Sequence, residues 1–468
     1  MSLEVNVVID SGPGDWQIVQ QVGGAADIPL AGRWQTVTSE TWASHIVLAR
    51  LVKEETGVLL TPWTAMKTAA DGTWRGVLRC VPAGGLYRLE TMLVPKPHVQ
   101  WGAIGQARHH LGVGDLWIIA GQSNSAGYGQ GPVWDPPENG VHLFNNAMRW
   151  GQACHPLNES THTAHAANRE WTNPMHSPWL HWARRVKQEI GWPIGLIQTS
   201  LGGSPLVSWN PTEPGEHALF DAMVQAVRAA GGAARGMLWY QGCSDANPVA
   251  GKTYLKRFTS AVKAWRKALK NPRLFVLTVQ INRAYAPPSA EGDLGWSTVR
   301  EAQRQAARTI EHCCVIPTID LPLSDVVHNS AHGNLVIAER SALAALGAAY
   351  GKPTAWQAPE IASAQVSRDG MSVALAFDHV TNALYRCDEQ TIPFAVTDAQ
   401  GPVPITKLDI TPPNVVQLTL GRKLQAPATL DGAPGINPPR ALHDWGRFQS
   451  MLAFAKFPIA PAAKKKRS

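Results

Sequence analysis

Short apolar runs alternate with longer amphipathic segments through the middle of the chain. Runs this short and apolar are typical of strands buried on both faces, and the spacing between them suits helices. The predicted strands lie at residues 116–120, 194–199, 237–240, 274–279 and 314–319. The predicted helices lie at residues 178–190, 217–230, 254–269, 298–309 and 334–350. Alternating strands and helices favour parallel pairing through crossover helices, so we expect a three-layer α/β/α domain.

The two ends of the chain show a different pattern. Short alternating runs broken by glycine and proline predict an all-β region over residues 1–112, with 94–112 as a linker. After Lys352-Pro353 the alternation returns, which predicts a smaller β-rich region over 352–468. We therefore expect an α/β domain at 113–351 between two β-sandwich-like domains, in keeping with a length of 468 residues.

Composition narrows the class of protein. Hydrophobic residues make up 44% and charged residues 16%, which is typical of a well-packed globular chain. The net charge is +7, but Lys464, Lys465, Lys466 and Arg467 carry four of these charges, so the rest of the chain carries only +3. We expect no nucleic-acid partner and interpret this basic tail as a solvated end, with a targeting or nucleic-acid role as the alternative.

Neither a membrane nor a disulfide framework is expected. No apolar run approaches the roughly 18 residues of a membrane span. The start of the chain lacks a basic region followed by an apolar core, so no signal peptide is predicted, although one could have been removed. The compartment therefore stays open. The cysteines are sparse and unpatterned, which favours free thiols; they are Cys80, Cys154, Cys243, Cys313, Cys314 and Cys387.

The first predicted strand of the α/β domain runs into Gly121-Gln122-Ser123-Asn124. A serine on a tight turn at the mouth of a buried strand is where hydrolases hold an exposed nucleophilic hydroxyl. The alternative is an ordinary turn with Ser123 as a helix cap.

A second cluster, residues 324–334, holds Asp325 and His328 three positions apart. One turn can place the carboxylate beside the imidazole, where it orients a general base. The alternative is a capped helix start, because Gly333 and Asn334 precede a helical apolar run. His332 is a weaker candidate, since no acidic residue precedes it at the same short spacing.

These motifs resemble the SGNH hydrolases, specifically their sialate O-acetylesterase and acetylxylan-esterase branch. Further blocks resemble that branch in the same order: 195–204 followed by Trp209, 239–246, and Trp296 with 300–303. The segment 84–87 also resembles the N-terminal β-domain of sialate O-acetylesterases. Ordered agreement at several places is a specific signal, whereas any single match would be weak.

The resemblance implies a flavodoxin-like catalytic domain, and a serine esterase that removes O-acetyl groups from carbohydrates, with O-acetylated sialic acid as the leading substrate. Ser123 would be the nucleophile, His328 the base and Asp325 the orienting carboxylate. The backbone N–H groups of Ser123 and Gly203 would hold the oxyanion. No metal or organic cofactor is implied.

The third oxyanion donor is less clear from the sequence. This branch of the family reads Gln-Gly-Glu-Ser in its third block, whereas Cys243 stands here in place of the glutamate. We expect the side chain of Gln241 to be the donor, with Asn124 as a rival. Cys243 as the nucleophile is conceivable, but Ser123 has the better setting.

Substrate contacts are expected from Gln122 and from aromatic rings that stack on sugars, with Trp171 and Trp209 as the leading candidates. The segment 151–177 also holds Cys154, His155, His162, His165 and His176, whose spacing could suit zinc. We expect this segment to shape the substrate cleft without a metal.

Three alternatives stay open at this stage. The ester could belong to acetylated xylan or another polysaccharide, or to a lipid or simple ester. The chain could also be a non-catalytic carbohydrate-binding protein on a hydrolase scaffold. The sequence does not indicate which sugar hydroxyl is acetylated, or the oligomeric state.

Overall fold

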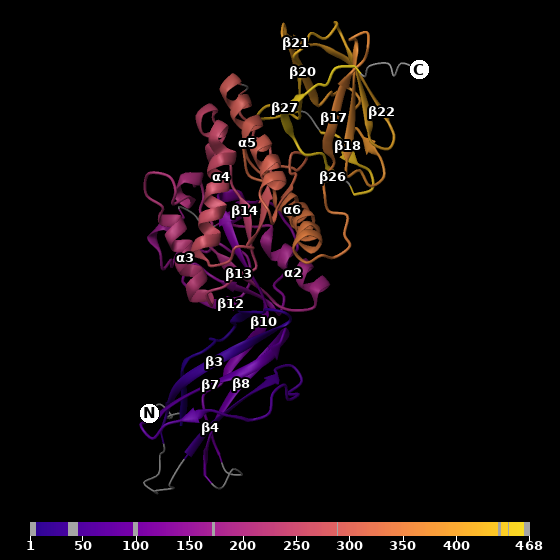
Figure 1. Ribbon diagram of the computed structural model, residues 1–468. Coiled ribbons are helices and arrows are strands. Elements are labelled where there is room, and N and C mark those ends of the chain that lie inside the picture. Colours follow the sequence, from indigo (N-terminus) through magenta and orange to yellow (C-terminus); the bar gives the residue numbers. More distant parts are fainter. Residues whose placement is uncertain are drawn as a thin grey trace.

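The computed structural model describes residues 6–35, 45–96, 102–170, 174–287, 289–438, 441–447 and 449–462. Three regions follow one another along a long axis, with an α/β region between two β-rich ends (Figure 1). The predicted fold class is confirmed: a central, mostly parallel sheet with helices is flanked by antiparallel sheets toward both termini.

The central sheet has the strand order β12-β11-β13-β10-β14-β15-β16. Its members are β12 (Trp150–Gln152), β11 (Val141–Phe144), β13 (Ile194–Gln198), β10 (Arg108–Gly121), β14 (Gly236–Tyr240), β15 (Phe275–Val279) and β16 (Cys313–Ile316). Neighbours pair in parallel except β11 and β12, which are antiparallel. Every residue of β13, β14 and β15 is buried, which explains their apolar sequences.

The helices of this region are α2 (Trp179–Ile190), α3 (Ala218–Ala230), α4 (Pro248–Ala268), α5 (Ala290–Thr309) and α6 (Ala331–Ala344). Helix α4 packs along α5, and α2 packs along α6 (Figure 1). Both α4 and α5 begin earlier than predicted. Asn247 caps α4 and Ser289 caps α5 through side-chain oxygens that accept backbone N–H groups. The first turns beyond these caps are only partly buried and carry few large apolar side chains, so apolar periodicity does not reveal them.

The N-terminal region contains two groups of strands. One sheet contains β1 (Val7–Ser11), β3 (Ala25–Trp34), β7 (Thr73–Pro82) and β6 (Lys67–Thr68). The other group contains β2 (Ile18–Gln20), β4 (His45–Lys53), β5 (Thr64–Ala65), β8 (Gly84–Pro95) and β9 (Ala103–Ile104).

Strand β10 joins the N-terminal region to the central sheet. Its first part pairs with β8 and β2, and its second part, from Asp115 onward, pairs with β13 and β14. The segment expected to be a linker therefore ends within a strand, and a boundary at residue 112 would fall inside it. The division at 112 and 351 remains a proposal.

The C-terminal region also consists of antiparallel strands. One sheet contains β17 (Glu360–Val366), β18 (Ser372–Asp378), β23 (Val415–Leu420) and β22 (Ile405–Thr411). A second contains β21 (Gly401–Val403), β20 (Phe394–Asp398), β24 (Thr429–Gly432) and β27 (Phe454–Pro458). A third contains β19 (Leu384–Tyr385), β25 (His443–Asp444) and β26 (Gln449–Ser450). The basic tail lies outside the described residues.

Hydrogen bonds from buried side chains join the C-terminal region to the central α/β region. Arg300 of α5 donates to the carbonyl oxygens of Gly435 and Ile436, and Gln280 donates to that of Ala453. In the part of the chain that the structure describes, no helix is both long enough and apolar enough to span a bilayer.

Candidate active site

The predicted site residues come together where the parallel strands β10, β13, β14 and β16 end, the usual position of ligands on such sheets. Strand β10 ends at Gly121, whose φ is +117° and whose place a larger residue could not take, because a Cβ there would lie 2.3 Å from the carbonyl oxygen of Tyr240. The one-turn helix α1 (Ser123–Ala126) follows and presents Ser123 at its first position.

Three side chains form a continuous hydrogen-bonded series. The Oγ atom of Ser123 lies 2.8 Å from Nε2 of His328, and Nδ1 of His328 lies 2.7 Å from Oδ2 of Asp325. The other carboxylate oxygen of Asp325 accepts the backbone N–H groups of Val327 and His328. This geometry suits proton transfer from Ser123 to His328.

Asp325 is held in its ionised form. Partial burial opposes ionisation, but the hydrogen bonds from Val327 and His328 outweigh it and lower the pKa of Asp325. An ionised carboxylate accepts the Nδ1 proton of His328, which leaves Nε2 free to accept the proton of the Ser123 hydroxyl.

Asn124, the rival oxyanion donor, instead clamps the loop that carries His328. Its amide nitrogen donates to the carbonyl oxygen of Val327, and its Oδ1 accepts both the backbone and the side-chain N–H of Asn329. Asn329 also bonds to Tyr240 and Asn282. One of the two amide N–H groups of Asn124 is therefore used to hold the loop 324–334, and its role as a rival oxyanion donor remains a prediction.

Two backbone N–H groups lie on segments that meet at Gly121, which bonds to both Leu201 and Ser204. The N–H groups of Ser123 and Gly203 have no acceptor among the described residues. Gly203 has a φ of +66°, and a Cβ added there would meet no described atom within 4 Å, so open space adjoins it. The hydroxyl of Ser244 donates to the carbonyl oxygen of Gly203 at 3.0 Å and helps to fix this peptide.

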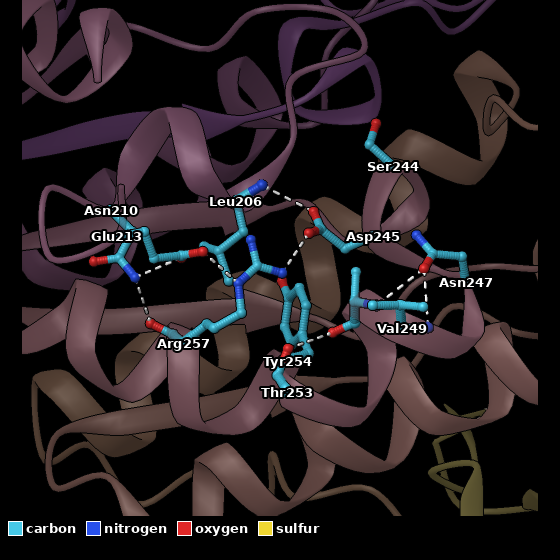
Figure 2. Close-up of polar contacts among 12 residues, drawn as sticks. Leu206, Asn210, Glu213, Ser244, Asp245, Asn247, Val249, Thr253, Tyr254 and Arg257 are labelled. Atoms are coloured by element: carbon cyan, nitrogen blue, oxygen red, sulfur yellow. Dashed lines mark hydrogen bonds and ion pairs between the residues drawn. The ribbon is translucent and has the colours of Figure 1, made fainter. Parts of the chain in front are cut away.

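The expectation for Gln241 is wrong. Its side chain is fully buried, and its amide nitrogen already donates to the carbonyl oxygen of Ser204 at 3.2 Å and to Asp245 at 2.6 Å. Figure 2 shows Asp245 bound also to the N–H of Leu206 and to Arg257, while Ser244 points away from this network. Gln241 therefore braces the loops beneath the site and has no donor left for an oxyanion.

Gln122 has the donor that Gln241 lacks. Its Oε1 accepts the backbone N–H groups of Gly242 and Ser244, at 3.0 and 3.3 Å. Its Nε2 has no acceptor in the described part of the chain. The sequence motif indicated Gln122 as a substrate contact, but residue type alone does not distinguish the two glutamines.

Cys243 is poorly suited to act as a nucleophile. Burial raises the pKa of its thiol to about 12, so the thiol stays protonated at neutral pH. Ser123, and not Cys243, is the residue that His328 contacts.

The aromatic contacts require a correction. Trp209 is 0% exposed, donates its indole N–H to Ser204 and packs edge-on against Trp239, so it has no face to offer a sugar. Trp171 lies outside the described residues. By contrast, Tyr285 is 55% exposed, and its backbone N–H donates to the carbonyl oxygen of Val326 in the catalytic loop. The abundance of tryptophan in the sequence thus favoured Trp209, a ring that is buried in the structure.

A tyrosine and a glutamate that the sequence analysis missed also belong to the site. The ring of Tyr128 stacks on the imidazole of His328, with centroids 5.0 Å apart and planes inclined by 25°. The Tyr128 hydroxyl donates to Glu170 at 2.9 Å, and Glu170 also accepts the N–H of Gly202 at 2.7 Å. No local spacing links these positions, so the sequence gives no signal for them.

The histidine-rich segment yields one group that could hold a metal. Within the described ranges, Asp135, His155 and His176 form the one set of three ligand atoms close enough together. However, the N–H of Ser177 and the amide nitrogen of Asn334 lie 3.5 Å from Nδ1 of His155 and of His176, respectively. The donor at Nδ1 of His155 favours a proton on its Nε2, which lies 2.8 Å from Asp135, whereas a metal ligand needs a nitrogen without a proton. The arrangement therefore favours a hydrogen-bonded network around Asp135.

Comparisons with known proteins indicate the family and the fold of this chain. The family model described as "Carbohydrate esterase, sialic acid-specific acetylesterase" matches residues 113–347, half of the chain. A probable carbohydrate esterase of Arabidopsis thaliana is 29% identical over 210 residues, covering 40% of this chain and 74% of that protein. The crystal structure of a carbohydrate acetylesterase from Xanthomonas citri shares the fold, with a TM-score of 0.66 at 19% identity over 96% of this chain and 99% of that one.

Proposed function

The chain belongs to the carbohydrate esterase family of sialic acid-specific acetylesterases, and we propose that it removes O-acetyl groups from sialic acids through an acyl-enzyme on Ser123. The observation that carries the proposal is the Ser123–His328–Asp325 series, with both of its hydrogen bonds below 3 Å. Family membership supports the acetyl group and the sialic acid.

In the first step, His328 Nε2 takes the hydroxyl proton while Ser123 Oγ attacks the acetyl carbonyl carbon. The negative charge that develops on the carbonyl oxygen is held by the N–H groups of Ser123 and Gly203 and by the amide of Gln122. When the intermediate collapses, the ester bond to the sugar breaks and His328 returns the proton to the departing sugar oxygen.

In the second step, His328 takes a proton from water, and the resulting hydroxide attacks the acetyl-serine. Collapse breaks the acyl bond, returns the proton to Ser123 and releases acetate. Asp325 keeps the imidazole in the required tautomer and stabilises the imidazolium formed in both steps. Tyr285, exposed beside the catalytic loop, is a suitable surface for a sugar ring.

The proposal is tested by acetate release from O-acetylated sialic acids, with acetylated xylan and a long-chain ester as competing substrates. We expect the wild-type chain to prefer the sialic acids and Ser123→Ala to lose a factor of roughly 10⁶ in kcat. Cys243→Ser serves as the matched control and should retain activity. Preference for xylan would overturn the substrate assignment alone, whereas undiminished turnover by Ser123→Ala would overturn the mechanism.

A further inference from the structure

We propose that Tyr128 and Glu170 hold the ring of His328 from its face. They also connect the histidine to residues 201–204, the oxyanion loop, whose Gly203 N–H would bind the oxyanion. The inference rests on the proposed triad and deepens it. Tyr128 and Glu170 act here as positioning residues, since both work through His328 or Gly203.

The stacking of Tyr128 on His328 favours the charged imidazole. The two centroids lie 5.0 Å apart, with the planes inclined by 25°, so the imidazole stacks on the tyrosine ring. An aromatic face attracts a cation. Because His328 becomes an imidazolium only when it takes the Ser123 proton, this attraction grows toward the transition state and lowers the barrier.

Glu170 is the group that fixes the ring. Its three donors are all neutral: the hydroxyl of Tyr128 at 2.9 Å, the amide of Asn158 at 2.9 Å and the N–H of Gly202 at 2.7 Å. Burial raises the pKa of Glu170 despite these bonds, and no lysine or arginine among the described residues is a cause of its pKa shift. A phenol that donates to a carboxylate becomes more electron-rich, which strengthens the attraction of its ring for a cation.

The same carboxylate positions the oxyanion loop. A Cβ at Gly202 would lie 2.8 Å from Glu170 Oε2 and 3.1 Å from the Tyr128 hydroxyl, so a glycine allows this close approach. With Glu170 bound to Gly202 on one side and Ser244 to the carbonyl of Gly203 on the other, the N–H of Gly203 is held in place.

Three residues contact the imidazole of His328, each at a different part of the ring. Among the described residues, Asp325 faces Nδ1, Ser123 faces Nε2 and Tyr128 faces the ring. Removing Tyr128 therefore leaves both hydrogen bonds of the triad intact. Its effect on the basicity of His328 can be measured separately from theirs.

The experiment measures the pH dependence of kcat/KM in the full-length chain with a small activated acetyl ester. The acid limb reports protonation of the general base in the free enzyme. We expect Tyr128→Leu to move this limb to lower pH by about half a unit. Tyr128→Phe and Glu170→Gln should move it by less, with kcat reduced several-fold and KM little changed. Glu159→Gln, the same change in a carboxylate that caps Thr161 in the same segment, is the matched control and should leave the acid limb unchanged.

An unmoved acid limb in Tyr128→Leu, or in Tyr128→Phe and Glu170→Gln should the leucine variant not fold, overturns the inference. Loss of folded protein cannot imitate the expected shift, because it changes the height of the profile and not its pKa. Ser123→Ala, assayed alongside, separates the two proposals. Turnover retained there overturns the triad and this inference with it, whereas turnover lost there with an unmoved acid limb overturns this inference alone.

Discussion

Asp325 and Asp135 both bind histidines, yet only the arrangement around Asp325 suits catalysis. Asp325 binds a single imidazole through Nδ1, which leaves Nε2 facing the hydroxyl of Ser123. Asp135 lies 2.8 Å from Nε2 of His155, 3.3 Å from Nε2 of His176 and 2.8 Å from Arg184. A histidine activates a nucleophile only where one nitrogen can accept its proton, and among the described residues no hydroxyl contacts a nitrogen of His155 or His176.

The largest difference in kcat is expected between variants of His328 and of His155. His328→Ala should lower kcat by a factor of roughly 10⁶, because the general base is lost. His155→Ala should change kcat by less than about threefold, since no nucleophile depends on His155. Steady-state acetate release by the two purified variants measures both. Comparable losses in the two would mean that the histidine-rich segment takes part in the reaction.

The aspartates should separate catalysis from stability. Asp325→Asn should lower kcat by about 10⁴, because the wrong tautomer of His328 is then favoured. Asp135→Asn should leave kcat nearly unchanged but reduce the free energy of unfolding by about 3–5 kcal/mol, because it leaves Arg184 without its buried partner. Urea denaturation and kcat, measured on both variants, show whether Asp325→Asn loses mainly activity and Asp135→Asn mainly stability. The reverse pattern would contradict the assignment of Asp325.

The two glutamines provide a smaller contrast of the same kind. Gln122→Glu removes the free amide donor but keeps an oxygen for Gly242, and it should lower kcat by about 10²–10³. Gln241→Glu places a second carboxylate beside Asp245, so its main effect should be lower stability. Measuring kcat at saturating substrate and the urea midpoint for each variant separates these effects. A larger loss of kcat in Gln241→Glu would restore Gln241 as the oxyanion donor.

The smallest expected effect concerns pH. Hydrogen bonds to Asp135 and Glu339 raise the pKa of His181 to about 9, above its ordinary value near 6.5. This contribution to stability is fully present below about pH 6.5 and is lost as the pH rises through about 9. Wild type should therefore lose more stability than His181→Gln between these values, measured by urea denaturation across the range. Parallel pH profiles would show that the charged His181 does not stabilise the fold.

The sequence predicts the central strands well because burial on both faces makes them continuously apolar. It misses β11, where the polar His142 lies within a short run although it is fully buried and bound to the carbonyl oxygen of Trp16. The starts of α4 and α5 were missed because caps and exposed first turns, not apolar spacing, define them.

In the candidate site, a tight turn and a short spacing led to the choice of Ser123, Asp325 and His328, whose side chains the fold brings within hydrogen-bond distance. The hydrogen-bond partners of a side chain leave no such pattern in the sequence. Nothing in the local sequence separates the free amide of Gln122 from the bound amide of Gln241, or shows that Trp209 is buried. Tyr128 and Glu170 meet only through the folded loops.

The central claim is that His328 activates Ser123. A fluorophosphonate, which reacts with activated serines, tests this directly when peptide mass spectrometry follows the labelling of wild type and His328→Ala. The account predicts one adduct per chain on Ser123, with activity lost in proportion, and no adduct in His328→Ala. An adduct on another residue, or full activity with Ser123 unlabelled, would contradict it.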